Sequence, residues 1–489
     1  MSSPVGRPPS PPTLVVPYDG HYYDEGSMEY KAWRQSALRP SVIAELERFV
    51  ANRITGRGRA KHVHTAEGSY NIMFQFQFSA RSDVALRIPK PGHTPAAIVA
   101  KKVLNEVAWM KFLKVRTRIP IPCVHDHSKR ADDHVPPLKL PFILMDFIQG
   151  QNLRTFLRLL GKPGEDAANN SKRTTIYEQI ATFYLQLHRL PLEAIGSIST
   201  HQLPGQCIVE GSPLTMDMHQ HLLGIPDYPT SNWPDKPFQH TSDYFDFVKT
   251  LQRNELWSLR NINMPWGWHP ETRGLMQLKC GEDVDLEQAA RIARLRYKSR
   301  QGFSQLIPHF TKGEDDGLFA PFNQDLDPRN MLVNPDTLQV TGVIDWEFTN
   351  AMPIQFARQP PLWLHYKVLP GPTLERGYFP WFLAEYEPFL NEFLAAMRRV
   401  EQSGGFGTGG KPLSTLMLES WKSQQCWFNH AATHSDCVDS IYWAVLHQHH
   451  PQDSEGLKAP AETDPELDKY IEHTKVQIIS YEKARDSLV

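Results

Sequence analysis

The alternation of apolar and polar residues predicts a small mixed lobe in the first third of the chain. Helical spacing of apolar residues extends over residues 28–53 and returns over residues 97–114. Two-residue alternation over residues 70–78 is typical of a strand with one buried face, and a second strand is predicted over residues 83–89. The continuous apolar run at residues 140–148 predicts a buried strand that ends this lobe.

After Gln149 the pattern becomes mainly helical. Apolar residues follow helical spacing over residues 176–190, 382–400 and 414–448. Residues 200–240 contain many Pro, Gly, Ser and His residues, a composition typical of an irregular insertion. The pattern therefore predicts a second, larger and mainly helical lobe.

These patterns divide the chain into three segments. Residues 1–30 begin with many prolines and are expected to form a disordered arm. Residues 31–148 form the smaller lobe and residues 149–489 the larger one. A chain of 489 residues is too long for one ordinary core, so we expect a cleft between the two lobes.

Charge and composition exclude several classes of partner. Lys and Arg number 52 and Asp and Glu number 54, so a nucleic-acid or anionic-membrane partner is not expected. No apolar run approaches the ~18 residues that a membrane span requires. The first residues lack the apolar core of a secretion signal and are too proline-rich for an amphipathic transit helix. Together with five scattered cysteines, these features favour a soluble cytoplasmic protein.

One polar stretch carries the candidate chemistry. In "FNQDLDPRNMLV" (322–333) the polar residues lead directly into a short apolar strand, followed by a turn signal at 334–337 and a second strand at 338–346. A hairpin of these strands would place Asn330 and Asp345 at the same open end, with Asp325 on the loop leading in. Oxygen ligands of this kind suit Mg²⁺, which takes one or two from protein and the rest from phosphate and water.

The spacing of these residues matches phosphoryl-transfer chemistry. Asp325 and Asn330 are five positions apart, the interval at which a kinase loop holds its catalytic carboxylate and a metal-binding amide. Asp345 stands where a kinase keeps a second metal-binding carboxylate. Two other interpretations are open: Asp325 could merely cap a turn, and Asp345 could pair with Glu347 as in glycosidases.

Several motifs together resemble the aminoglycoside phosphotransferase family, and its fungal members in particular. "NQDLDPRNMLV" and "VTGVIDWE" resemble its catalytic loop and metal motif. "AEGSYN" resembles its phosphate loop, "VALRIPKPG" its third strand, "NEVAWMKFLKVRTRIPIP" the next helix, and "FILMDFIQG" its hinge. The likeness extends over roughly residues 60–450, with the motifs in the family's order. It implies an α+β, bilobal protein-kinase-like fold with a small sheet-bearing lobe and a larger helical lobe.

The resemblance also implies roles for single residues. Asp325 would be the catalytic base, and Asn330 and Asp345 the Mg²⁺ ligands. The nucleotide, ATP, would be held by the phosphate loop, the third-strand cation with its helix glutamate, and the hinge backbone: Gly68, Ser69, Arg87, Glu106, Asp146 and Ile148.

Two positions depart from the family's pattern. Asn323 stands in place of the loop histidine, and Arg87 in place of the third-strand lysine, with Lys90 as an alternative phosphate contact. The favoured function is ATP- and Mg²⁺-dependent phosphoryl transfer to a hydroxyl of a small molecule. Arg87 keeps open the alternative of a nucleotide-binding pseudokinase or scaffold. A protein kinase is less favoured, because no Asp-Phe-Gly or Ala-Pro-Glu motif occurs at the expected places. The sequence identifies neither the acceptor nor the oligomeric state.

Overall fold

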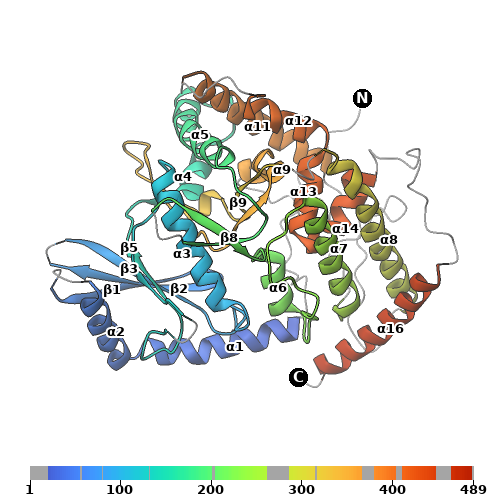
Figure 1. Ribbon diagram of the computed structural model, residues 1–489, viewed down its shortest axis with the longest axis horizontal. Coiled ribbons are helices and arrows are strands. Elements are labelled where there is room, and N and C mark those ends of the chain that lie inside the picture. Colours follow the sequence, from blue (N-terminus) through green and yellow to red (C-terminus); the bar gives the residue numbers. More distant parts are fainter. Residues whose placement is uncertain are drawn as a thin grey trace.

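Within the described residues, five strands form the antiparallel sheet of the smaller lobe in the computed structural model (Figure 1). Their spatial order is β1 (Ala60–Glu67), β2 (Asn71–Phe78), β3 (Arg81–Pro89), β5 (Ile143–Asp146) and β4 (Val124–His127). The strand predicted over residues 70–78 is confirmed, because Phe74, Phe76 and Phe78 are buried and the residues between them are not. The buried run at 140–148 is also a strand, although only its centre pairs in the sheet.

A helix covers each face of this sheet. Helix α2 (Pro40–Arg53) packs Leu46 and Val50 against the phenylalanine face of β2. Helix α3 (Val99–Arg116) packs Val103 and Val107 against the opposite face, where the side chains of Ala85 and Met145 point. Successive side chains of a strand point to opposite faces of the sheet. The position of a residue in its strand therefore determines which of the two helices its side chain contacts.

The first helix corrects one expectation from the sequence. The structure describes residues 20–54, 58–79, 81–130, 133–200, 204–261, 286–313, 317–365, 379–403, 410–447 and 464–486. Helix α1 (Gly20–Ala37) begins within the segment 1–30 expected to be disordered, and the preceding residues 1–19 lie outside the described ranges. The proline-rich composition of the first residues does not extend to residue 20, and α1 gains stability from tertiary contacts such as the buried Tyr30.

Helices make up most of the larger lobe, as predicted. They are α4 (Leu153–Leu159), α5 (Ala167–His188), α6 (Met216–Gly224), α7 (Thr241–Ser258), α8 (Leu286–Phe310), α9 (Ile354–Ala357), α11 (Phe379–Ser403), α12 (Leu413–Lys422), α13 (Gln425–Thr433), α14 (Val438–Ile441) and α16 (Pro465–Asp486). One continuous core links the lobes, from Ala85 and the α3 side chains to α5, α11 and α13. The fold is therefore α+β and bilobal, like that of protein kinases.

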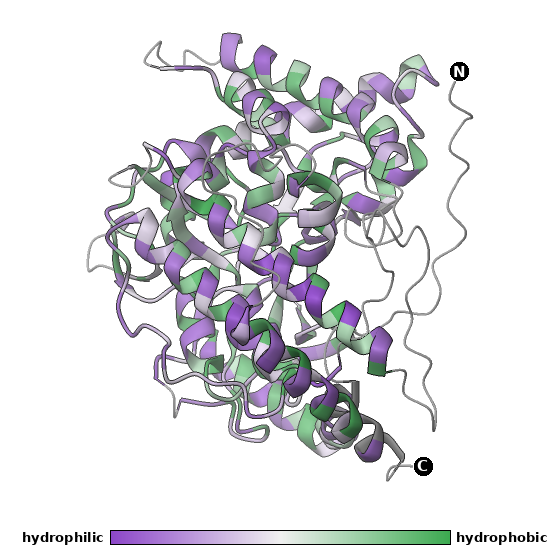
Figure 2. Cartoon of the chain, turned by 90° about the vertical axis from the view of Figure 1, so that its right-hand side faces the viewer, coloured by the Kyte–Doolittle hydropathy of each residue, from purple (hydrophilic) through white to green (hydrophobic). Residues whose placement is uncertain are grey.

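Most helices of the larger lobe are amphipathic. Figure 2 shows hydrophilic and hydrophobic residues mixed along them. Among the described helices, none has the length and apolar character that crossing a bilayer demands.

The segment 200–240 is more regular than its composition predicts. Strands β7 (Ser197–Thr200) and β8 (Cys207–Gly211) form a hairpin, and α6 follows with Thr215 as its N-cap. Asn105 of α3 holds the hairpin through its Oδ1, which accepts a 2.9 Å hydrogen bond from the Ile198 backbone. Packing against α3 thus orders a segment whose composition alone suggested an irregular loop.

The predicted hairpin is confirmed. Strand β10 (Met331–Val333) pairs antiparallel with β11 (Val340–Val343), and β6 (Gln151–Asn152) adds to the other edge of β10. A second pair, β9 (Phe319–Asn323) and β12 (Thr349–Pro353), flanks it. The segment from Gln324 to Asn330 therefore connects two strand pairs at the cleft between the lobes.

Candidate active site

The open end of the β10–β11 hairpin brings the predicted residues together. The Ile344 backbone N–H donates a 2.8 Å hydrogen bond to the carbonyl of Asn330, which places Asp345 beside this residue. The Asn330 amide donates to the Asp325 carboxylate at 2.8 Å and to the Asp325 carbonyl at 2.9 Å. The structure thus brings Asp325, Asn330 and Asp345 together, as the sequence predicted.

Asn323 ties the two carboxylate-bearing segments to each other. Its Oδ1 accepts a 2.7 Å hydrogen bond from the Asp325 backbone, and its Nδ2 donates to the Asp345 carbonyl at 3.2 Å. Asp345 adopts a left-handed backbone (φ 66°), a conformation that costs energy outside glycine. The amide of Asn323 therefore serves as a scaffold at the position where the resembled family has histidine.

Burial and, second, the nearby charge of Asp345 raise the pKa of the Asp325 carboxyl to about 7. Arg329 and Asn330 oppose this rise; the Arg329 guanidinium lies 3.1 Å from Asp325 Oδ1. Asp327 is a capping residue, because it accepts a 2.8 Å hydrogen bond from the Arg329 backbone. A carboxylate whose pKa lies near neutral pH is well suited to accept a proton.

Arg87 joins the smaller lobe to this site. Its Nη1 pairs with Glu106 of α3, so the predicted ion pair is confirmed, and its Nη2 lies 2.8 Å from Asp345 Oδ1. Burial alone would lower the pKa of Arg87, but the charges of Asp345, Glu106 and Glu347 raise it. The planar fork of arginine allows both pairs to form at once, which a lysine ammonium could not do in the same geometry.

Lys102 and Glu347 belong to the same cluster; the sequence did not point to Lys102, and it pointed to Glu347 only as a possible glycosidase carboxylate. The Lys102 ammonium lies 3.2 Å from Glu347 Oε2, and the Asn71 amide donates to the same carboxylate at 3.2 Å. Burial lowers the pKa of Lys102, and Glu347 opposes that shift. Lys102 lies one helical turn before Glu106, a spacing that could have indicated a shared face. These contacts leave Glu347 no role in a glycosidase pair.

The net negative charge of this cluster is suited to binding a divalent cation. Among its described residues, three carboxylates (Glu106, Asp345 and Glu347) meet two cations (Arg87 and Lys102), so one negative charge is unbalanced when all are ionised. Burial, the first cause, and the charge of Glu347 raise the pKa of Asp345. No group of three or more His, Cys, Asp or Glu residues in the described part of the chain could bind a metal. One Asp and one Asn are consistent with Mg²⁺, which takes few ligands from protein.

The phosphate loop spans Gly68 to Tyr70, between β1 and β2. The Gly68 N–H donates to the Asn71 carbonyl at 2.9 Å, which closes the turn, and Ser69 faces the cavity described below. Lys90, the alternative phosphate contact, lies beside this loop, because its ammonium donates to the Gly68 carbonyl at 2.6 Å. The predicted phosphate contact of Gly68 and Ser69 stays a prediction.

The two hinge residues make contacts that neither support nor exclude adenine binding. The Asp146 carboxylate accepts hydrogen bonds from the Cys123 backbone at 3.0 Å and from His125 at 2.8 Å. The side chain of Ile148 packs against Gly342 of β11. Their predicted role concerns the backbone and stays a prediction.

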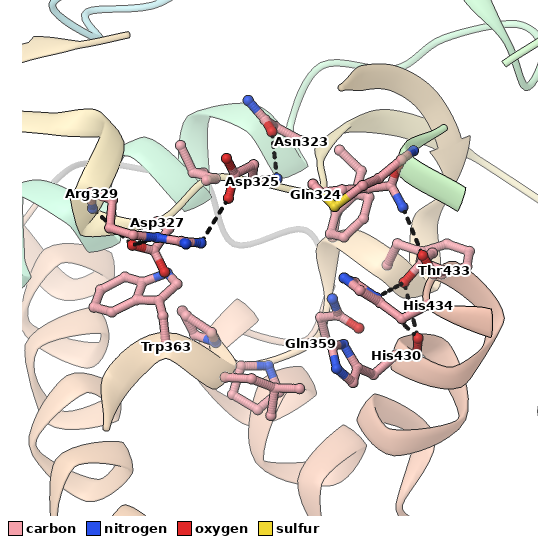
Figure 3. Close-up of a pocket in the computed structure, with 18 of the residues that line it drawn as sticks. Asn323, Gln324, Asp325, Asp327, Arg329, Gln359, Trp363, His430, Thr433 and His434 are labelled. Atoms are coloured by element: carbon pink, nitrogen blue, oxygen red, sulfur yellow. Dashed lines mark hydrogen bonds and ion pairs between the residues drawn. The ribbon is translucent and has the colours of Figure 1, made fainter. Parts of the chain in front are cut away.

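A cavity of about 420 Å³ opens beside Asp325. Figure 3 shows two walls that face each other, with Asp325 between them: one is formed by Asp327, Arg329 and Trp363, the other by His430, Thr433 and His434. Ser69 and Tyr70 of the phosphate loop also line it. A small molecule in this cavity would therefore contact both Asp325 and the phosphate loop. The sequence did not predict these walls.

Several polar groups of the cavity can accept hydrogen bonds. Arg329 is paired with Asp325 and Asp327, the latter at 3.0 Å. Burial lowers the pKa of His430 well below its usual range, so this imidazole is neutral at pH 7. Oδ1 of Asp436 and Oε1 of Gln359 are buried without a hydrogen-bond partner among the described residues. The cavity is thus suited to a molecule that donates hydrogen bonds.

Comparison with known proteins confirms the family resemblance. Residues 65–230 match the phosphotransferase enzyme family. The chain is 25% identical over 324 residues to altered inheritance of mitochondria protein 9 of Debaryomyces hansenii, and 22% identical over 324 residues to the Saccharomyces cerevisiae protein of that name. In each case 60% of this chain is matched, and it spans about half (48%) of the curated relative.

Solved structures of phosphotransferases are also similar to this chain, at low identity. A type VIII aminoglycoside-3'-phosphotransferase has 13% identity and a TM-score of 0.34, with 82% of this chain and 98% of that chain covered. A Streptomyces rimosus aminoglycoside phosphotransferase in complex with ADP and streptomycin has 14% identity and a TM-score of 0.33, with 76% and 90% covered.

The expectation of a cytoplasmic location is wrong. The curated relatives from D. hansenii and S. cerevisiae are both named as mitochondrial proteins. Charge, cysteine content and the pattern of the first residues indicate the kind of aqueous environment that suits a chain. They do not distinguish the cytosol from the interior of an organelle.

Proposed function

We propose that this chain, which matches the phosphotransferase enzyme family over residues 65–230, transfers a phosphoryl group from ATP to a hydroxyl of a small molecule. One observation carries the proposal. Asp325 lies between a cavity that could hold an acceptor and the Arg87–Asp345 pair that could face a nucleotide. A base, an acceptor cavity and a charged cluster are the parts that such a reaction requires.

The charged cluster would hold the nucleotide. Asp345 and Asn330 would bind Mg²⁺, which when present neutralises charge on the nucleotide phosphates. Arg87, fixed by Glu106, would present its remaining positive edge to phosphate oxygens. Ser69 and the backbone of Gly68 would cover the phosphates from the smaller lobe.

Asp325 would orient the acceptor and take its proton. A bond forms between the acceptor oxygen and the γ-phosphorus, the bond from that phosphorus to the bridging oxygen breaks, and ADP leaves. The hydroxyl proton passes to a carboxylate oxygen of Asp325. The Asn330 amide donates a hydrogen bond to this carboxylate, and the Asp325 backbone N–H donates one to Asn323, so both the side chain and the backbone of Asp325 are held in place for this step.

Arg87 is the feature that favours the alternative, a nucleotide-binding pseudokinase. Its contacts with Glu106 and Asp345 instead support an active arrangement, because the arginine pairs with the helix glutamate and leaves Asp325 free to face the cavity. ATP consumption in the presence of an accepted alcohol distinguishes the two functions.

Calorimetric titration with ATP tests the proposal, with and without Mg²⁺ and with the Asp345→Ala variant. We expect the parent to bind Mg–ATP and the variant to lose the Mg²⁺-dependent part of the affinity, because it lacks the charged ligand. Asp336→Ala, at the exposed turn of the same hairpin, is the control and should bind like the parent. Equal affinity in Asp345→Ala and the parent would reject the metal assignment.

We further propose that the protein works in mitochondria, which the names of its curated relatives support. Fractionation of cells that express the full-length protein would test this. Recovery in the cytosolic fraction alone would contradict it.

A further inference from the structure

We propose that helix α1 positions the phosphate loop, with Tyr30, Arg34 and Glu67 as positioning residues. The inference rests on the proposed function, because it assigns to this loop the binding of nucleotide phosphates. Helix α1 lies before residues 65–230, the part that matches the phosphotransferase enzyme family. Control of the loop by α1 would therefore come from outside the matched segment.

Glu67 is the point of contact between α1 and the loop. It is the last residue of β1 and immediately precedes Gly68. Tyr30 donates a 2.7 Å hydrogen bond from its hydroxyl to Glu67 Oε2, and Arg34 pairs through Nε with Oε1 at 2.5 Å. Two residues of one helix thus hold both oxygens of this carboxylate and fix the entry to the loop.

Lys90 makes a second connection. Its ammonium donates to the Gly68 carbonyl and lies 3.6 Å from Glu67 Oε2. It also lies 4.4 Å from the centre of the Tyr30 ring, within the range of a cation–π contact. Tyr30 therefore supports the loop twice, through its hydroxyl and through its ring.

The backbone of α1 is fitted closely to the smaller lobe. Gly26 lies against Gly92, which has a left-handed backbone (φ 70°), and a Cβ atom at Gly26 would collide with the Gly92 carbonyl. The Tyr30 ring meets the His93 ring edge-on, with ring centres 5.4 Å apart. These contacts fix α1 along the segment that follows β3.

Helix α1 also reaches the larger lobe. Figure 1 shows it extending from the region of α2 toward α6, which it contacts. Helix α6 supports the far end of the loop, because the ring of its His219 lies 4.3 Å from the ring of Tyr70. His219 also hydrogen-bonds to Lys102 at 2.7 Å. The loop is therefore held at one end by α1 and at the other by α6, and these two helices touch.

The expected consequence is an effect on nucleotide affinity. A loop that is already ordered loses less conformational entropy when it binds phosphate, so preorganisation strengthens binding. Arg34 is partly exposed, and exposed ion pairs contribute little by themselves. Tyr30 is buried and should therefore carry the larger share of the effect.

The test compares Tyr30→Phe and Arg34→Ala with Lys31→Ala, which removes an exposed cation from the same helix. The first readout is hydrogen exchange of the peptide over residues 67–71 without nucleotide. We expect faster exchange in Tyr30→Phe, a smaller increase in Arg34→Ala, and parent-like exchange in the control. The second readout is Mg–ATP affinity, which should weaken about threefold to tenfold in Tyr30→Phe, the order expected for one lost hydrogen bond to a carboxylate.

Swapping the charges of Arg34 and Glu67 gives a further test. Arg34→Glu should speed exchange of the loop, and the double variant Arg34→Glu with Glu67→Arg should restore part of the protection. A purely structural role of α1 would lower the melting temperature without this local pattern. Unchanged loop exchange in Tyr30→Phe, or tighter Mg–ATP binding, would overturn the inference. If the parent bound no nucleotide, the proposed function would fail, and the exchange data would still decide whether α1 positions the loop.

Discussion

Asn323 shows how one short side chain can organise a catalytic loop. Its amide accepts from the Asp325 backbone and donates to the Asp345 carbonyl, so it fixes the distance between the proposed base and the proposed metal ligand. An amide can do this because it has both a donor and an acceptor on one planar group. This position therefore requires a side chain with a suitably placed hydrogen-bond donor and acceptor, and it does not require a titratable ring.

Asp325→Asn tests the proposed base. The substitution keeps the shape and an oxygen that can accept the hydrogen bond from Asn330, but it removes the basic carboxylate. We expect turnover to fall by about 10²–10⁴-fold, the usual contribution of a general base, with Mg–ATP affinity and melting temperature close to the parent. Steady-state ATP consumption with any accepted alcohol measures the change.

Asp327→Asn is the matched control for this experiment. Asp327 caps the turn at Arg329, and an Asn oxygen can still accept that hydrogen bond, so this variant should lose less stability than the ~1 kcal/mol of a missing cap and should keep its turnover. Retained turnover in a stable Asp325→Asn protein would remove Asp325 from the mechanism.

At the scale of elements, Gln324 connects the catalytic loop to two helices that line the cavity, α6 and α13. Its Oε1 accepts a 2.8 Å hydrogen bond from the Met216 backbone at the start of α6. Its Nε2 donates at 3.2 Å to the carbonyl of Thr433 at the end of α13. Gln324 directly precedes Asp325, so the position of the carboxylate depends on two helices that also line the acceptor cavity.

Gln324→Ala should therefore affect use of the acceptor more than nucleotide binding. Small displacements of a reacting group reduce rates strongly, and we expect kcat/KM for the acceptor to fall roughly tenfold or more. Mg–ATP affinity should not change, because neither hydrogen bond reaches the nucleotide side. Gln339→Ala, on the exposed turn of the hairpin, is the control. An equal loss of ATP affinity and acceptor use would show that Gln324 supports the fold in general.

At the scale of the whole molecule, a buried ionic network joins three helices of the larger lobe. Arg296 and Arg300 of α8 lie 3.3 and 3.1 Å from Glu255 of α7, and both also pair with Asp439 of α14. Burial would raise the pKa of Glu255, but Arg300, then His221 and Arg296, lower it to about 2. Because each ion is paired, the network avoids the penalty of an isolated buried charge.

This network predicts a pH dependence of stability. The pKa of Glu255 is lower in the folded state (about 2) than in an unfolded chain (about 4.3), so its contribution is present above about pH 4.3 and is lost as the pH falls toward 2. A difference of about two units corresponds to roughly 3 kcal/mol. Glu255→Gln should thus lower the free energy of unfolding at pH 7 by about that amount, and the difference from the parent should shrink between pH 4.5 and pH 3.

Urea unfolding of the parent and the variant at several pH values measures this difference. Glu178→Gln, which removes a more exposed pair with Arg399, is the control and should show little change at any pH. A deficit of Glu255→Gln that stayed constant from pH 7 to pH 3 would contradict the assigned pKa.

Local patterns in the sequence were sufficient for the hairpin, the strand alternation at Phe74 to Phe78 and the convergence of Asp325, Asn330 and Asp345. These features depend on residues close in sequence, where turn chemistry and side-chain period act directly. The Arg87–Glu106 pair was also predictable, from the family resemblance.

Tertiary structure alone decided the contacts between distant segments. Asn71 meets Glu347 across 276 positions, and Lys102 meets His219 across 117 positions, and no periodicity encodes such pairs. The order of α1 depends on Glu67 and Gly92, and the hairpin of β7 and β8 depends on α3, so composition alone misjudged both segments. Such contacts form only when folding brings the segments together, because their energy comes from burial and hydrogen bonds made across the cleft and between the lobes.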